Sequence, residues 1–248
     1  MRRCRIRNGL ARLEVAVQEI RAASAGETIT ISAWPGFAAF WLIPRLPLLQ
    51  AAFPNHDLCI LSGGHSDDVT HGDLQIRFGD GRWPDIQAEK ILGEEVFAVC
   101  SPRYLRGRRT PLPLRELKAA RLLRLVENTP RWYGWTTWFE ALGSPLKRPS
   151  RTLDFDSYPL LASAALAGQG IALCWDGLLD EFLNNGALVR VTADSVPSTR
   201  GYFVTHRTGI EPDSAIRAVS KWLRQNAVGA RPAVPMGNSA ATAAVEEL

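Results

Sequence analysis

The sequence of 248 residues has few cysteines and no pattern that would join them into a site. Its four cysteines are widely spaced, without a C-x-x-C pair and without a histidine at metal-ligand spacing, which argues against a zinc site and against a disulfide framework. Cys59, Cys100 and Cys174 lie inside apolar runs. We therefore expect buried, reduced thiols and no bound metal.

Long hydrophobic stretches are also missing. No window approaches 18 uncharged apolar residues, and the richest run, residues 37–49, is broken by two prolines and an arginine, so no transmembrane helix is predicted. The first 24 residues are rich in arginine, but Arg12, Glu14 and Glu19 interrupt the apolar core that a signal peptide needs. We therefore expect a cytoplasmic protein without membrane contact.

Catalytic motifs are absent as well. The sequence has no G-x-S-x-G nucleophile elbow, no H-E-x-x-H and no glycine-rich phosphate loop. The adjacent carboxylates Asp67 and Asp68 begin an expected helix and diverge from each other. An enzyme is the main rival class, but nothing here supports it, so we predict no catalytic residue and no cofactor.

Positive charge is concentrated in two segments. The first 25 residues hold six arginines against two glutamates, and the remainder balances 23 basic with 23 acidic residues. Within that remainder, residues 103–124 carry eight basic residues against Glu116 alone. A nucleic-acid patch and a solvated loop and helix face both fit this segment, and the lack of interleaved aromatics other than Tyr104 favours the solvated face.

Hydrophobic periodicity predicts an α/β fold. A heptad stripe runs through residues 5–23, and strands at 29–33, 57–61 and 74–78 alternate with a helix at 37–53 and a short helix after Ser66. This βαβαβ order is typical of a parallel sheet that binds ligands beyond the carboxyl ends of its strands. Further strands are expected at 88–92, 96–100, 122–126, 152–155, 171–174, 188–191 and 202–205, and further helices within 102–121 and at 132–143, 156–167, 178–183 and 212–225.

Several segments together resemble a known family. The runs ISAWPGFAAFWLIPRLPLLQAAFPNHDLCI, DLQIRFGDGRWP, VFAVCSPRYL, FDSYPLLASAALAGQGIALC and GYFVTHR resemble the effector-binding domain of LysR-type transcriptional regulators, in particular the branch of the glycine-cleavage activator and the beta-lactamase-inducing regulator. The resemblance covers residues 28 to about 226 in order, and residues 5–24 resemble the second half of the family's linker helix.

The resemblance implies a two-lobed, periplasmic-binding-protein-like (type 2) fold with two crossover hinge strands, preceded by a linker helix. Residues 1–26 would form the C-terminal part of the linker or dimerisation helix, 27–99 with 202–226 lobe I, 100–201 lobe II, and 227–248 a disordered tail. The crossovers would be residues 99–101 and the entry to Tyr202. No winged helix-turn-helix is recognised before Ile6, so we expect DNA contact only through a domain that this chain lacks.

The resemblance places an effector between the lobes. Ser32, Trp34, Pro35, Gly36 and Phe37 leave the first strand and open a helix, so that the amides of Gly36 and Phe37 could hold an anionic or amide oxygen. The same residues would also suit a strand-to-helix turn that binds no ligand.

Four further residues are candidates for the effector site, each with an alternative. Ser157 lies at the start of a helix that faces the cleft from lobe II. Asp156 and Ser157 would also serve there as ordinary N-capping residues of that helix. Tyr202 either lines the cleft or packs in the core. Arg77 either binds a ligand carboxylate in the cleft through two guanidinium donors or forms a structural ion pair with an acid such as Asp80. Trp135 belongs to a tryptophan series at spacings of three, of which only some members can face the cleft.

The function expected from the resemblance is ligand sensing. A small polar or anionic metabolite would bind in the interlobe cleft and control transcription through the geometry of a homodimer or homotetramer. Two alternatives stay open: a solute-binding protein, which would need an export signal, or a truncated regulator that acts only by dimerising.

Overall fold

The computed structural model describes residues 28–62, 72–126, 132–147, 149, 151–207 and 213–227. The expected linker helix, the short helix after Ser66 and the tail beyond residue 227 lie outside the described residues. None of the helices in the described part of the chain is both long and apolar enough to cross a membrane.

The described chain alternates strands with short helices, as the periodicity predicts. The strands are β1 (Ile29–Ala33), β2 (Leu58–Ser62), β3 (Leu74–Gly79), β4 (Ile86–Cys100), β5 (Arg121–Leu125), β6 (Arg151–Phe155), β7 (Ala172–Trp175) and β8 (Val189–Arg207). The α-helices are α2 (Pro35–Phe37), α3 (Leu46–Ala52), α4 (Pro102–Leu105), α5 (Leu114–Ala119), α6 (Trp135–Ala141), α7 (Tyr158–Leu166), α8 (Asp180–Asn184) and α9 (Ser214–Gln225).

Six of these strands form one mixed sheet in the order β2-β1-β3-β8-β4-β7. The predicted parallel arrangement of the first three strands is confirmed, because β1 runs parallel to both β2 and β3. The remaining pairs in this sheet, β3 with β8, β8 with β4 and β4 with β7, are antiparallel. Strands β5 and β6 form a separate parallel pair.

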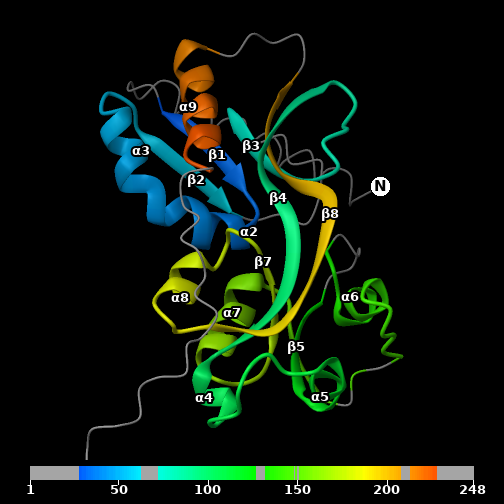
Figure 1. Cartoon of the computed structure of the whole chain (residues 1–248). Helices are drawn as coiled ribbons and strands as arrows, with labels where there is room; N and C mark the ends of the chain where they lie inside the picture. The colour runs from blue at the N-terminus through cyan, green and yellow to red at the C-terminus, as the bar shows by residue number, and fades with distance from the viewer. Residues whose placement is uncertain are drawn as a thin grey trace, which may run out of the picture.

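Two long strands run through the whole molecule. β4 and β8 pair with each other along most of their length and join an upper group of elements (β1, β2, β3, α2, α3 and α9) to a lower group (β5, β6, β7 and α4 to α8) (Figure 1). Each of them was predicted as two strands, which is wrong: 88–92 with 96–100 is one strand, and 188–191 with 202–205 is another.

Glycines at the crossing explain the division. Gly93 pairs with Gly201, and a Cβ on Gly201 would lie 2.1 Å from the backbone oxygen of Leu92. At Gly201 only glycine allows so close an approach, whereas a Cβ on Gly93 would meet no atom within 4 Å. From sequence alone both glycines resemble turn residues. The pairing continues across them with shifts in register on both sides.

The register also bears on where the chain passes between the two groups. Val96–Val99, which were predicted in lobe I, pair with β7 of the lower group. Gly201–Thr205 pair with β3 of the upper group. The division into lobes and the positions of the two crossovers remain predictions.

The segment after β1 contains a break near its prolines, as expected. α2 is followed by a π-helical turn at Ala38–Leu42, a 3-10 turn at Ile43–Arg45 and then α3. Pro44 and Pro47 each lack a backbone donor, so a regular α-helix cannot continue through them. Phe37 and Trp41 precede this bend and stack at 4.7 Å between ring centroids.

The expectation of buried, reduced thiols is met by the cysteines that the structure describes, except that Cys59 is only half-buried. Cys59, Cys100 and Cys174 are free. Burial raises the pKa of Cys100 to about 12, and it raises the pKa of Cys174 as well. Neither thiol therefore ionises near neutral pH.

Candidate functional site

An aromatic cluster lies where the upper and lower groups meet. Its rings come from the α2 segment, β3 and β8 above and from the segment before α6, α7 and β7 below. We call these residues the aromatic cluster: Trp34, Phe37, Trp41, Phe78, Trp132, Tyr158, Trp175 and Tyr202. The cluster is where side chains from both groups are brought into one contact network.

Trp132 is the most connected ring of the cluster. Its centroid lies 4.0 Å from that of Phe78, 5.8 Å from Tyr202, 5.9 Å from Trp34 and 5.6 Å from Trp175. The first three partners belong to the upper group and Trp175 to the lower group. Trp132 is only partly buried, so it lies at the accessible margin of the junction.

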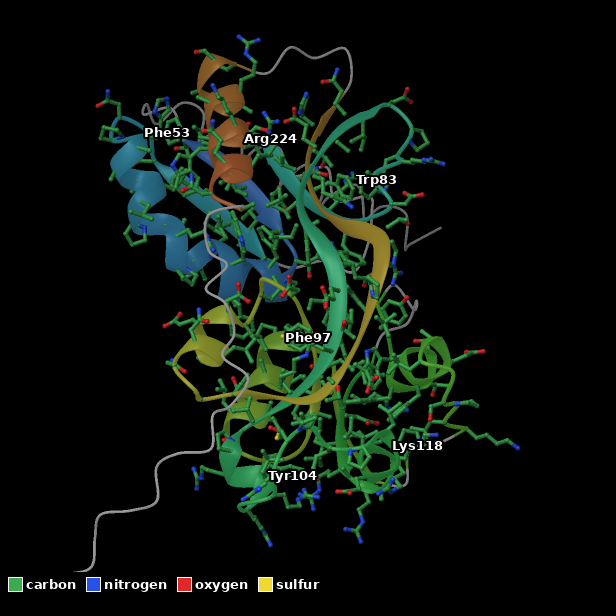
Figure 2. The ribbon with its side chains drawn as sticks, in the orientation of Figure 1. Phe53, Trp83, Phe97, Tyr104, Lys118 and Arg224 are labelled. Carbon is green, nitrogen blue, oxygen red and sulfur yellow. The ribbon has the colours of Figure 1, made fainter. Side chains whose placement is uncertain are left out.

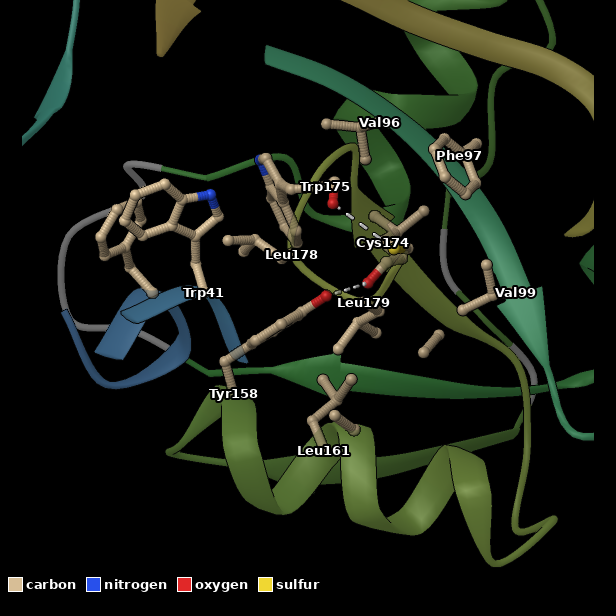
Figure 3. Packing of buried hydrophobic residues seen from close by; sticks show 14 of the residues in the cluster. Trp41, Val96, Phe97, Val99, Tyr158, Leu161, Cys174, Trp175, Leu178 and Leu179 are labelled. Carbon is tan, nitrogen blue, oxygen red and sulfur yellow. Dashed lines mark hydrogen bonds between the residues drawn. The ribbon is translucent and has the colours of Figure 1, made fainter. Parts of the chain in front are cut away.

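A second contact between the groups is formed by α2 and α7. Gly36 is buried, and a Cβ at this position would lie 2.7 Å from Cδ1 of Tyr158. The Tyr158 hydroxyl donates a hydrogen bond to the carbonyl oxygen of Leu173 at 3.3 Å, and Figure 3 shows the side chain extending from α7 towards β7. Burial raises the pKa of Tyr158 well above its ordinary value, so this phenol is neutral and acts as a donor.

A buried carboxylate lies beside the cluster at the crossing of β4 and β8. Glu94 is 3% exposed and accepts hydrogen bonds from Trp175 Nε1 at 2.9 Å and from the Ser198 hydroxyl. Arg200 donates to it from Nε at 2.9 Å and from Nη2 at 3.2 Å. Buried charges need such partners, and here the partners come from β7 and β8. Through Trp175, this network joins the crossing strands to the aromatic cluster.

The structure brings Trp34, Gly36 and Tyr202 together at this junction. Tyr202 is 4% exposed, and its ring lies 5.0 Å from that of Phe37. Phe37 itself is fully buried, so its side chain belongs to the core rather than to a ligand-facing surface. Pro35 occupies the first turn of α2, where its fixed φ and missing N–H suit a helix start.

Two predicted residues lie on the other face of the sheet. Arg77 donates from Nε and Nη2 to Gln75 Oε1 at 3.1 and 2.9 Å, and its guanidinium lies over the ring of Trp83. Phe78, its neighbour in β3, faces the aromatic cluster, so Arg77 points away from the junction. Ser32 is the register partner of Gln75 and shares that face.

Trp135 lies in the core of the lower group, and Ser157 lies at the start of α7. Trp135 is 2% exposed and donates from Nε1 to the carbonyl oxygen of Leu123, which makes it a core residue of the lower group. Trp138 is also in the core, as expected, and donates to Val96. Ser157 is the N-cap residue of α7, but its side chain makes no capping hydrogen bond, so the expected cap is wrong.

The residues predicted for the site did not include Trp132, Tyr158, Trp175 or Glu94. The tryptophan spacing contained a usable signal, because residues 135 and 138 lie inside a helix whereas Trp132 precedes it and is free to turn towards the junction. Glu94 carried a weaker signal, as an acidic residue inside an apolar strand pattern. Among the described residues, no group of three or more potential ligands could hold a metal ion.

Comparison with known proteins agrees with this architecture. A family model described as "LysR substrate binding domain" matches residues 22–228. The glycine cleavage system transcriptional activator of Escherichia coli K12 is 27% identical over 220 residues, 88% of this chain and 71% of that protein. The HTH-type transcriptional activator AmpR of Pseudomonas aeruginosa is 29% identical over 204 residues, 81% of this chain and 66% of that protein.

Solved structures show the same fold. The effector domain of AmpR from Pseudomonas aeruginosa superposes with a TM-score of 0.67 at 28% identity, covering 82% of this chain and 96% of that chain. The regulatory domain of CrgA from Neisseria meningitidis gives a TM-score of 0.66 at 20% identity, with coverage of 82% and 99%, which supports the fold alone. The chain therefore belongs to the LysR substrate-binding domain family, and it is the effector-binding domain of a LysR-type transcriptional regulator, a family that is not enzymatic.

Proposed function

We propose that a small polar or anionic metabolite binds at the aromatic junction, between two lobes of a type 2 periplasmic-binding-protein-like fold. Lobe I would contain β1 to β3 and α9, lobe II would contain α4 to α8, and the strands β4 and β8 would act as hinges near Gly93 and Gly201. The site residues of this proposal are Trp34, Pro35, Gly36, Phe37, Trp132, Ser157, Tyr158 and Tyr202.

One observation carries the proposal: a partly buried tryptophan, Trp132, contacts rings of both groups at the margin of their junction. Aromatic faces bury the apolar part of a ligand, whereas a few hydroxyls and amides orient its polar part. The start of α2 presents the amides of Gly36 and Phe37, and the first amides of a helix have no acceptor within the helix. These groups suit a carboxylate, a phosphate or an amide oxygen.

The regulatory step would be a change in lobe closure. A ligand changes an equilibrium between open and closed states only if it binds one of them more tightly. A ligand that contacts Trp34 from one lobe and Trp132 from the other meets this requirement, because both contacts exist only when the lobes are close. In a cytoplasmic dimer or tetramer, closure would alter the spacing of the subunits and so the control of transcription.

The test begins with a thermal-shift screen of amino acids, nucleobases, sugar phosphates and cell-wall fragments, followed by calorimetry on the hits. Trp132→Ala should weaken binding by more than about thirtyfold, because it removes a central aromatic contact. Trp83→Ala is the matched control: Trp83 is also partly buried, but it contacts Phe203 and Arg77 on the opposite face of the sheet.

Tyr202→Phe isolates the contribution of one hydroxyl. If the phenol contacts the ligand, binding should weaken by about three- to tenfold, the usual effect of losing one hydrogen bond. Equal affinity of the wild type, Trp132→Ala and Tyr202→Phe for a confirmed ligand would contradict the placement of the site.

A further inference from the structure

The lower end of the molecule contains a groove that the interlobe site does not use. It has a volume of about 620 Å³ and lies beside α4 and α5, at the end opposite to α9 (Figure 1). Figure 2 marks this end of the molecule by Tyr104 and Lys118. We call it the arginine groove, after the charged residues that line it: Arg103, Arg106, Arg108, Arg121, Arg151 and Glu116.

Distant parts of the sequence supply these arginines. Arg103 belongs to α4, and Arg106 and Arg108 follow it, whereas Arg121 begins β5 and Arg151 begins β6. β5 and β6 pair in parallel with Arg121 directly opposite Arg151, so the fold itself brings these two side chains to the same edge. The charge run at 103–124 is a mostly exposed face, as the favoured interpretation predicts, and folding brings two parts of it, residues 103–108 and Arg121, together with Arg151 around the groove.

The groove carries an excess of positive charge. Five guanidinium groups line it against the single carboxylate of Glu116. In the part of the chain that the structure describes, no ion pair joins any of the five arginines to an acidic side chain. The next arginine along β5 differs, because Arg124 forms a salt bridge with Asp154 of β6. All five arginines are exposed, so water and salt screen their mutual repulsion, while an anion in the groove would be attracted by several of them at once.

Several contacts fix the walls of the groove. The Tyr104 hydroxyl accepts a hydrogen bond from the backbone N–H of Arg121 at 2.9 Å, which ties α4 to the start of β5. Arg108 donates from Nε to the carbonyl oxygen of Leu105 at 3.3 Å, and its guanidinium lies 6.0 Å from the Tyr104 ring. Arg106 adopts a left-handed conformation with φ of 49°, a backbone geometry that favours glycine or asparagine over arginine.

We propose that the arginine groove binds a small phosphorylated metabolite with several negative charges, at a site separate from the interlobe junction. Guanidinium groups present paired donors that match phosphate oxygens, and several of them around one hollow suit a di- or triphosphate better than a monoanion. The volume accommodates a ligand of nucleotide size. Duplex DNA needs positive charges spread along an extended face, whereas these charges converge on one small hollow.

The probe for the test is inorganic triphosphate, titrated calorimetrically into the full chain at low ionic strength. The wild type should bind it in a one-to-one complex. Arg106→Ala/Arg151→Ala should weaken that binding by about tenfold or more, because each substitution removes a charge-assisted contact. Folding of each variant is checked by circular dichroism and by its unfolding midpoint.

The matched control removes the same charge elsewhere. Arg109→Ala/Arg115→Ala takes two exposed arginines from the neighbouring loop and from α5, neither of which lines the groove, and it should change the affinity by less than about twofold. Equal weakening in both double variants would overturn the proposal in favour of general electrostatic attraction. Failure of the wild type to bind triphosphate would overturn it as well.

Two further measurements separate this proposal from its alternatives. If a labelled 20-base-pair duplex bound in a manner sensitive to Arg106→Ala/Arg151→Ala while triphosphate did not bind, the groove would be a nucleic-acid contact and the proposal would be wrong. Trp132→Ala should leave triphosphate binding unchanged, because Trp132 lies at the junction and not in the groove. Failure of the arginine-groove proposal can therefore be distinguished from failure of the proposed interlobe site.

Discussion

Glu94 provides a quantitative test of the network at the strand crossing. Glu94→Ala leaves Trp175 Nε1, the Ser198 hydroxyl and two guanidinium donors of Arg200 without their acceptor. Breaking a buried ion pair costs about 3 to 5 kcal/mol, and because the Arg200 side chain is 32% exposed, water recovers part of its solvation. We therefore expect the lower end of that range, a loss of about 3 kcal/mol in the free energy of unfolding. Glu94→Gln keeps an acceptor and should cost less.

The assay is urea unfolding at pH 7 followed by tryptophan fluorescence, with Glu89→Ala as the matched control. Glu89 lies on the same strand and also forms a salt bridge with an arginine, Arg224, but the two side chains are 41% and 40% exposed. Such exposed pairs contribute about 0 to 1 kcal/mol. If Glu94→Ala destabilised the protein no more than Glu89→Ala, the reasoning about the buried carboxylate would be refuted.

Three other predictions follow from the same structure. Gly36→Ala should lower the free energy of unfolding by about 1 to 3 kcal/mol, because the added methyl group would overpack against the ring of Tyr158. Urea unfolding measures this change, and an unchanged midpoint would contradict the contact. Iodoacetamide at pH 8 should label half-buried Cys59 in the folded protein but Cys100, with its pKa raised to about 12, only after unfolding, as peptide mass spectrometry would show. A hydrogen bond from Arg124 lowers the pKa of Asp154, so this exposed pair should add less than about 1 kcal/mol above pH 4 and lose that contribution as the pH falls. Asp154→Asn should therefore reduce the difference in unfolding free energy between pH 7 and pH 2 by less than about 1 kcal/mol, and a larger reduction would contradict the estimate.

Most of the elements could be predicted from the sequence, because local hydrophobic patterns govern them. β1 alternates buried Ile29, Ile31 and Ala33 with partly buried residues, which is the pattern that predicts a strand packed on one face. The continuity of β4 and β8 could not be predicted in this way. Their pairing depends on contacts between segments about 100 residues apart, and the close approach at Gly93 and Gly201 looks like two turns in the sequence.

The candidate site was predictable only in part, for a related reason. The strand-to-helix turn at Trp34 and Gly36 is a local feature, and the family resemblance located it. Which tryptophan of the 132, 135 and 138 series faces the junction depends on how α6 packs. Trp135 donates to the carbonyl oxygen of Leu123 and lies in the core. Trp132, which precedes the helix, instead contacts Phe78 of the upper group.

In the proposed site, Trp175 would connect the ligand to the strand crossing. Its ring contacts Trp132 and Tyr158 within the aromatic cluster, while its Nε1 donates to Glu94 at the strand crossing. If a ligand displaced Trp132, its ring contact with Trp175 would change, and Trp175 also donates to Glu94, the acceptor that it shares with Arg200 of β8. Because β4 and β8 connect the two groups, we expect this hydrogen bond to couple ligand binding to lobe closure without a longer pathway through the protein.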